Sequence, residues 1–318
     1  MRRIFCVLVL FALMGSVVFA AGDQETASAK PFPSDSIELI VPFGAGGGTD
    51  RIARAVANAL QNELGQPVVV VNKTAAGGVI GSNEIAQATP DGYTIGVFSN
   101  TDVANFEYKV KTGVEFTTDS FTYLGGLNVT GDLLIAAKGS GIESLSDFVS
   151  EAKASAGTVT VALPSGTQNL NVSIMEDVIG IDVSGVVFGG GGEVMSNLIG
   201  GHTDVGILSA QFAGQAEEQG LVVLGVMLDE RLETIDHVPT FAELGYPVSN
   251  TASRMLVAPK GLPQDVIDAY ENALANAYAG SLSTELRNMG EAPVYKNSTA
   301  LKAFLEKDFA MRKKLLSN

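Results

Sequence analysis

The sequence predicts an α/β protein of two lobes, each a mainly parallel sheet flanked by helices, with a ligand cleft between them. Two observations lead to this fold class. Short apolar strands alternate with helical stretches through most of the chain, and the connections are short, as in parallel sheets with helices on both faces. A strand that ends in a glycine turn and opens a helix occurs in each half of the chain, which indicates two similar domains.

The predicted strands are short apolar stretches. In chain order they are Ile37–Val41, Val68–Val71, Tyr93–Phe98, Leu133–Ala137, Val159–Leu163, Gly185–Phe188, Val205–Leu208, Leu221–Met227 and Met255–Ala258. Between them, apolar residues recur at the three- and four-residue spacing of a helix face. These predicted helices are Thr49–Leu64, Leu145–Ala154, Asn169–Ile179, Glu193–Ile199 and Gln211–Gln219.

The chain becomes almost wholly helical after Pro263. The predicted segments are Gln264–Ala279, Ser283–Met289 and Ser298–Leu315. We expect these helices to pack back on the first sheet; a separate helical domain is the alternative.

The N-terminus has the order of residues found in a secretory signal. Two arginines follow Met1, an apolar run extends from Ile4 to Phe19, and small residues follow, so cleavage is expected after Ala20. The apolar run is shorter than the roughly 20 residues that a membrane-spanning helix needs, although an uncleaved anchor is the alternative. The one cysteine, Cys6, lies inside this signal. The exported form is therefore expected to have neither a thiol nor a disulfide.

The pattern predicts the following domain boundaries. Residues 1–20 form the signal peptide, 21–32 a linker, 33–129 the first part of domain I, 130–250 domain II, and 251–318 the C-terminal, mostly helical part of domain I. The chain would cross between the domains near Asn128–Gly131 and return near Ser249–Ser253. Both segments are small, polar or glycine-containing, and both suit hinges.

The charge balance argues against nucleic acid as a partner. The chain has 20 Lys and Arg against 35 Asp and Glu, a formal net charge of −15, and no basic patch is visible in the sequence. This charge would repel an anionic ligand at long range. Because salt screens charges over roughly 10 Å, local hydrogen-bond donors would control the binding of such a ligand.

The most informative segment is the glycine loop after the first strand. It reads Phe43-Gly44-Ala45-Gly46-Gly47-Gly48-Thr49-Asp50. A glycine turn that opens a helix presents bare backbone N–H groups at the positive end of the helix, and these can bind a small anion. The alternative is that the glycines only make a tight turn. For Thr49 and Asp50, helix capping and direct ligand contact are about equally expected.

The loop lacks the features of nucleotide-binding loops. Thr49 occupies the third glycine position of the dinucleotide fingerprint, and no Gly-Lys-Ser or Gly-Lys-Thr of a phosphate-binding P-loop follows the glycines. A carboxylate is therefore the anion that this loop favours.

The second half repeats the arrangement. The strand Val159–Leu163 runs into the turn Ser165-Gly166-Thr167, and Asn169 lies in the opening of the next helix. Two anion-binding loops at the carboxyl ends of two sheets indicate a ligand clamped between domains. Ser99 and Asn100, with the neighbouring Thr101, end the third strand at the same kind of sheet edge; contact with a ligand and an ordinary polar loop are about equally expected. Arg254 could meet a distal carboxylate, but a salt bridge is the more expected role.

Several stretches resemble the Bug family, the extracytoplasmic solute receptors of tripartite tricarboxylate transporters. The similarity spans about Pro33 to Leu315 and keeps the order of the family's segments. The resembling stretches are Ile40–Asp50, Leu64–Val70, Asn72 with Ala75–Gly81, Pro90–Thr94 and Val238–Tyr246.

This resemblance implies a periplasmic binding protein of the type II-like Venus flytrap fold. It would capture a small organic acid, a di- or tricarboxylate or a related carboxylate, and deliver it to the membrane permease subunits of the transporter. In the family, backbone groups and bridging waters hold one ligand carboxylate between two loops, which correspond here to Phe43–Gly47 and Ser165–Thr167.

The second domain departs from the family pattern. Asn169 replaces a common histidine, and Phe188-Gly189-Gly190-Gly191-Gly192 replaces a Tyr-Lys pair, which implies a roomier wall. The stretch Asp204–Ala210 also lacks a second acidic residue near Leu208. A plain carboxylic acid is therefore favoured over an amino acid.

The rival class is a secreted α/β enzyme that acts on a small anionic substrate. Its chemistry is poorly supported, because the mature chain has no cysteine and its two histidines, His202 and His237, lie near a glycine pair and in a loop. No nucleophile elbow, two-histidine metal pattern or calcium loop is present in the sequence. We therefore expect neither an enzyme nor a resident cofactor or metal. An adhesion module would need repeats or long all-β patterning, which the sequence lacks.

Overall fold

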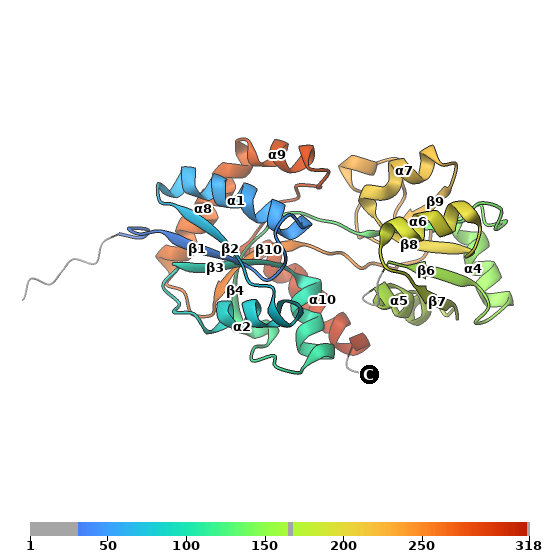
Figure 1. Ribbon diagram of the computed structural model, residues 1–318, viewed down its shortest axis with the longest axis horizontal. Helices are drawn as coiled ribbons and strands as arrows, with labels where there is room; N and C mark the ends of the chain where they lie inside the picture. The colour runs from blue at the N-terminus through green and yellow to red at the C-terminus, as the bar shows by residue number, and fades with distance from the viewer. Residues whose placement is uncertain (1–30, 165–167, 317–318) are drawn as a thin grey trace, which may run out of the picture. The chain divides into compact units, whose positions relative to one another are not determined.

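The structure is a computed structural model that describes residues 31–164 and 168–316 (Figure 1). The predicted signal peptide, nearly all of the predicted linker, and the turn Ser165–Thr167 lie outside these residues. Among the described residues, no helix combines the length and the apolar character that crossing a membrane requires.

The fold is α/β, which is the class that the sequence predicts. It is built on two sheets, each with both parallel and antiparallel strands. The first has the strand order β11-β4-β10-β3-β1-β2 and the second the order β7-β6-β8-β5-β9. The strands of the first sheet are β1 (Ile37–Val41), β2 (Val68–Asn72), β3 (Thr94–Ser99), β4 (Phe121–Gly126), β10 (Arg254–Pro259) and β11 (Lys296–Asn297). Those of the second are β5 (Asp132–Ala136), β6 (Thr160–Leu163), β7 (Ser184–Val187), β8 (Val205–Ser209) and β9 (Val222–Val226).

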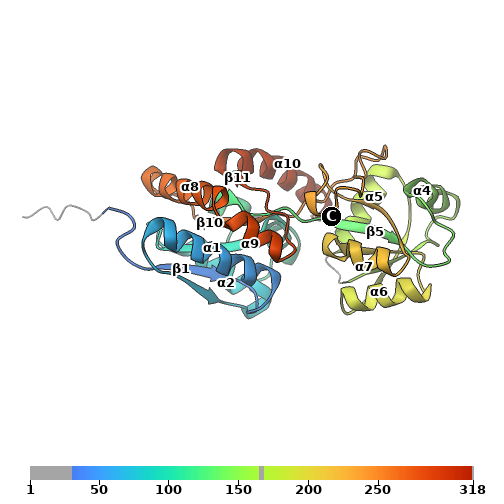
Figure 2. The same ribbon diagram turned by 90° about the horizontal axis from the view of Figure 1, so that it is seen from above.

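Helices cover both faces of the first sheet because its strands are apolar on both faces. Leu39 and Val41 of β1 belong to a buried cluster with helices α1 (Gly48–Leu64), α8 (Gln264–Ala279) and α9 (Leu282–Asn288), and Figure 2 shows α8 and α9 alongside α1. Ile40 points to the opposite face, as the alternation of a strand requires. That face is covered by α2 (Val79–Gln87), α3 (Asn100–Asn105) and α10 (Ser298–Leu316).

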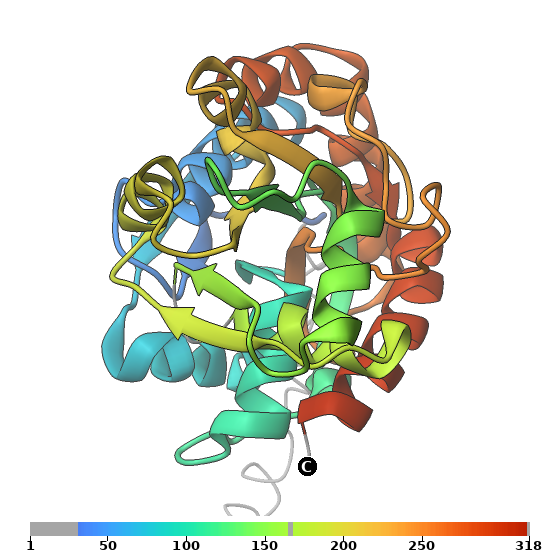
Figure 3. The ribbon, with the colours of Figure 1, turned by 90° about the vertical axis from the view of Figure 1, so that its right-hand side faces the viewer.

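The second sheet is covered in the same way. Figure 3 shows α4 (Leu145–Ala154) and α5 (Asn169–Ile179) on one face and α6 (Gly191–Gly200) and α7 (Ala213–Glu218) on the other. Helix α10 also lies against α5, and its residues Met311 and Leu315 pack against the core on that side of the second sheet. The C-terminal helix thus contacts the helices of both sheets.

One strand in the middle of each sheet runs against its neighbours, which the prediction of mainly parallel sheets does not include. Strand β10 is antiparallel to β3 and β4, and β5 is antiparallel to β8 and β9. Each of these two strands is the first strand after the chain passes from one sheet to the other. The chain arrives at the edge where the parallel strands end, so the arriving strand must run away from that edge. The short edge strand β11 is also antiparallel to its neighbour, β4.

Candidate functional site

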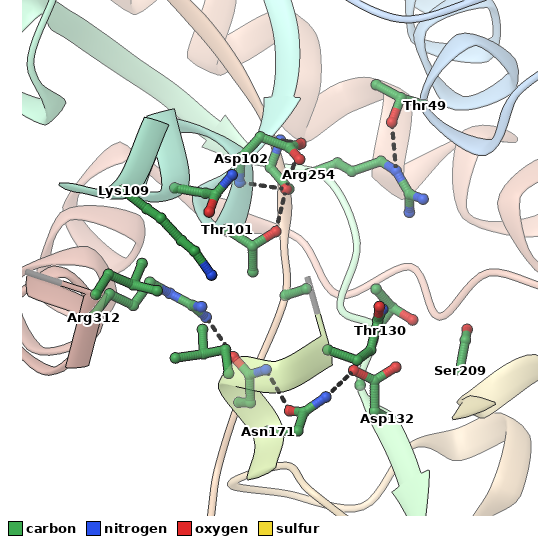
Figure 4. Close-up of a pocket in the computed structure, with 18 of the residues that line it drawn as sticks. Thr49, Thr101, Asp102, Lys109, Thr130, Asp132, Asn171, Ser209, Arg254 and Arg312 are labelled. Carbon is green, nitrogen blue, oxygen red and sulfur yellow. Dashed lines mark hydrogen bonds between the residues drawn. The ribbon is translucent and has the colours of Figure 1, made fainter. Parts of the chain in front are cut away.

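The candidate site is a cavity of about 370 Å³ lined by residues of both sheets (Figure 4). Ser99 ends β3 and Ser209 ends β8, whereas Asp132 begins β5 and Arg254 begins β10. The ends of the parallel strands and the starts of the two reversed strands therefore meet around one space. Thr130, Asn250 and Ala252, from the two segments that connect the sheets, also line it.

A capping box fixes the wall at the start of α3. The backbone N–H of Asp102 donates to the Ser99 hydroxyl oxygen at 3.1 Å, and the backbone N–H of Ser99 donates to the Asp102 carboxylate at 3.0 Å. Burial raises the pKa of Asp102, against the opposing effect of the Ser99 hydrogen bonds and of the cations Arg254 and Arg312. The Asp102 carboxylate is thus engaged in local structure rather than open to a guest.

Arg254 connects three parts of the site. Its Nε donates to the Thr49 hydroxyl at 3.2 Å, and its Nη1 donates to the Glu291 carboxylate at 3.3 Å. The side chain also lines an adjoining cavity of about 460 Å³. The expected salt bridge of Arg254 is present, and it ties the start of α1 to the segment after α9.

A chain of hydrogen bonds, part-buried at Asp132 and buried beyond it, runs from the cavity wall to the C-terminal helix. Asn171 donates to the Asp132 carboxylate at 2.7 Å, Asn250 donates to Asn171, and Nη2 of Arg312 donates to Asn250 at 2.8 Å. Nε of Arg312 then donates to Asp308 at 2.7 Å. The chain joins α5, a connecting segment and α10, so it fixes the second sheet's side of the cavity relative to the first.

Burial has an electrostatic consequence at Asp132. It raises the pKa of this carboxyl, and the Asn171 hydrogen bond opposes the rise only in part.

The glycine loop contributes to the cavity through side chains. Phe43 and Thr49 line it, whereas Gly44, Ala45, Gly46 and Gly47 are not among its lining residues. Two backbone donors of this loop are already used, because the Gly46 N–H donates to Asp50 and the Gly47 N–H donates to the Gly44 carbonyl. No described side chain caps α1, so the first-turn N–H groups of that helix have no side-chain acceptor. Binding of an anion by these groups stays a prediction.

Asp50 closes this loop instead of facing the cavity. Its side chain is 2% exposed and accepts from the Gly46 N–H at 2.8 Å, from Asn72 at 2.9 Å and from Arg54 at 2.9 Å. Burial alone would raise the pKa of Asp50, but these partners outweigh it and hold the pKa below its ordinary value. Asp50 neither caps α1 nor lines the cavity in this structure; its side chain holds the glycine loop instead.

Asn100 is likewise a structural residue here. It is fully buried and donates to the Thr251 carbonyl at 3.0 Å and to Asp308 at 2.8 Å, while its oxygen accepts from the Ser253 N–H at 2.8 Å. The preceding residue, Ser99, lines the cavity, and so does Thr101. Asn100 thus holds the returning segment against α3.

The predicted residues of the second domain are dispersed. Asn169 lines a separate cavity of about 280 Å³. Phe188 packs half-buried against the core of the second sheet, and the Gly189 N–H donates to Glu193 at 2.7 Å. The turn Ser165–Thr167 lies outside the described residues. The structure therefore brings five of the residues considered in the sequence analysis into the candidate-site cavity: Phe43, Thr49, Ser99, Thr101 and Arg254.

Several lining residues were not predicted: Asp102, Lys109, Thr130, Asp132, Asn171 and Arg312. Thr130 lies in a segment that the sequence analysis identified as a crossing, so its position could have been anticipated. Asn171 and Arg312 reach the cavity through packing of distant helices, and no local pattern marks them.

Comparison with known proteins shows the family of this chain. A model of the family described as "Tripartite tricarboxylate transporter family receptor" matches residues 52–318. The chain belongs to this receptor family. A relative from Bordetella pertussis, described as a UPF0065 protein, is 31% identical over 289 residues, which are 88% of each chain.

Solved structures show the same fold. A TctC solute binding protein from Polaromonas, without ligand, has a TM-score of 0.82 and 28% identity, over 89% of this chain and 98% of that one. MatC from Rhodopseudomonas palustris, solved with malate, has a TM-score of 0.65 and 25% identity, over 90% of this chain and 100% of that one. The resemblance to the Bug family is confirmed, and both family and fold are those of solute-binding receptors.

Proposed function

We propose that this protein is an extracytoplasmic receptor that captures a small organic carboxylate and delivers it to a tripartite tricarboxylate-type transporter. The observation that carries the proposal is the cavity where the ends of both sheets and both connecting segments meet. A ligand in this space would contact every part that has to move if the lobes close. The hydroxyl of Thr49 and three nearby cationic side chains suit a carboxylate.

Family membership supports the same ligand class. MatC, with 25% identity, was solved with malate, a hydroxylated dicarboxylate. We propose small organic carboxylates as the ligand class of the present chain, without proposing malate itself. The acceptors Asp102 and Asp132 are each held by neighbours, so they leave the cationic and hydroxyl groups to define the guest.

The domain division completes the proposal. Residues 33–129 and 251–318 would form one lobe and residues 130–250 the other, with hinges near Asn128–Gly131 and Ser249–Ser253. A ligand that contacts both lobes stabilises the closed form by its additional contacts there, and the permease would recognise that form. Residues 1–20 would direct export to the periplasm and be removed. The receptor would act without catalysis and without a resident cofactor.

Thermal melting of ligand-free mature protein tests this function. The panel consists of mono-, di- and tricarboxylates, aromatic acids, amino acids and sugars. A ligand at a hundred times its dissociation constant adds about 2.7 kcal/mol, which raises the melting midpoint of a chain this long by roughly 5 °C or more. A shift produced by one class of carboxylate supports the proposal. A shift produced only by sugars or other neutral compounds would overturn it.

A further inference from the structure

Lys109 brings an uncompensated charge to the cavity of the candidate site. It lies in the segment Phe106–Val110 that directly follows α3, and Figure 4 shows its ammonium group pointing into the cavity. The side chain is exposed, and within the described part of the chain it has neither an ion pair nor a hydrogen bond. A lone ammonium group at the wall of a cavity is a binding point for an anion.

Arg312 brings an unused donor to the same wall. Its Nε donates to Asp308, and its Nη2 donates to Asn250 and to the Thr251 carbonyl, but its Nη1 has no partner among the described residues. The side chain is 0% exposed. Buried N–H groups in proteins nearly always have an acceptor. Arg312 lines the cavity, but Nη1 has almost no accessible surface in this structure. A guest would therefore supply an acceptor for Nη1 only after the wall beside this atom opens.

The two groups lie on the same wall. In Figure 4, Lys109 and Arg312 extend from the same side toward the centre of the cavity, away from Thr49 and Ser209. The charge of Arg312 is balanced by Asp308, so Lys109 supplies the attraction and Arg312 supplies the directed donor. A carboxylate at this wall would accept a charge-assisted hydrogen bond from Lys109, and it would accept one from Nη1 of Arg312 once the atoms that cover Nη1 move aside.

The remaining charged lining groups are already paired. Arg254 is 3.3 Å from Glu291. Asp102 accepts from Ser99, and Asp132 accepts from Asn171. Among the described lining residues, the unpaired positive charge is therefore at the wall formed by Lys109.

We propose that Lys109 and Nη1 of Arg312 form a subsite for a second carboxylate of the ligand, opposite a first carboxylate held near Thr49 and the start of α1. The proposal rests on the proposed function and makes it narrower. A dicarboxylate fills both positions, whereas a monocarboxylate of the same carbon number leaves Lys109 and Nη1 without an anion. The receptor should therefore select dicarboxylates.

The experiment measures dissociation constants by calorimetry for three matched pairs: succinate with butyrate, malate with 3-hydroxybutyrate, and adipate with hexanoate. The variant is Lys109→Gln, which removes the charge from an exposed side chain and is expected to fold. The matched control is Lys313→Gln, which removes the same charge from an exposed position next to Arg312 that does not line the cavity. Circular dichroism checks that both variants are folded.

The wild-type protein should bind at least one dicarboxylate about 10-fold or more tightly than its partner. Lys109→Gln should raise the dissociation constant of that dicarboxylate by about 10-fold and change that of the matched monocarboxylate by less than about 2-fold. Lys313→Gln should change neither dissociation constant. Equal weakening of both members of a pair, or no weakening by Lys109→Gln, would overturn the subsite. If the protein binds both members of each pair equally well, the subsite is overturned but the proposed function stands. If it binds no carboxylate at all, the proposed function is overturned.

Discussion

Replacing Arg312 by methionine tests whether the buried network holds the site together. Arg312 is 0% exposed and its partner Asp308 is 5% exposed. Removing one member of a buried ion pair costs about 3–5 kcal/mol, because it leaves the other charge uncompensated. Asp308 keeps its hydrogen bond from Asn100 at 2.8 Å, so we expect a loss near the lower end, about 3 kcal/mol of unfolding free energy.

Urea unfolding of the mature protein, followed by circular dichroism, measures this loss. Lys313→Met is the matched control, since Lys313 is exposed and adjacent in sequence, and surface changes of this kind stay within about 0.5 kcal/mol. The double variant Arg312→Met with Asp308→Asn should be more stable than Arg312→Met alone, because no buried charge is left without a partner. A loss below about 1 kcal/mol in Arg312→Met, or no recovery in the double variant, would refute the reasoning.

Two further predictions concern the glycine loop and a half-buried acid of the cavity wall, Asp132. Gly46 has a φ of +80°, whereas Gly44 does not have a positive φ. Gly46→Ala should therefore destabilise the protein by about 1–2 kcal/mol and weaken carboxylate binding, and Gly44→Ala should do neither. Identical melting of the two variants would contradict the need for glycine at position 46. Burial raises the pKa of Asp132 above its ordinary value of 3.8, so its contribution to stability is present below pH 3.8 and is lost as the pH rises through the folded-state pKa. Asp132→Asn keeps an acceptor for Asn171 and should melt above wild type at pH 7, with the gap closing toward pH 3.8; a gap that does not change with pH would contradict this sign.

The regular elements were predictable where the apolar pattern was strong. The predicted bounds of α4, α5 and α8 agree with the structure, because each has an apolar face at helical spacing. Strand β4, Phe121–Gly126, was not predicted. It alternates poorly and ends in two glycines, and its place between β10 and β11 is decided by its partners rather than by its own pattern.

Strand direction was harder to predict than strand position. The alternation of apolar residues is the same whichever way a strand runs, so the pattern could not show that β5 and β10 are reversed. The predicted crossings near Asn128–Gly131 and Ser249–Ser253 do indicate the direction of the next strand. A chain that enters a sheet at the edge where the parallel strands end must run antiparallel to those strands.

The site was predictable only in part, since much of it depends on contacts between distant segments. Phe43, Thr49 and Ser99 follow directly from strand ends, and the structure places them in the cavity. Asn171 and Arg312 come from helices separated by most of the second half of the chain, and they meet only after both sheets are assembled. Motifs indicate loops at strand ends, but they do not indicate which helix will supply the opposite wall.

The central claim is that a carboxylate binds in the cavity where both sheets and both connecting segments meet. The most direct measurement is a crystal structure of the mature protein with the carboxylate that gives the largest melting shift. We predict that its carboxylate oxygens lie within hydrogen-bonding distance, about 3 Å, of cavity-lining groups from both sheets. A ligand bound outside this cavity, or in contact with one sheet alone, would contradict the account.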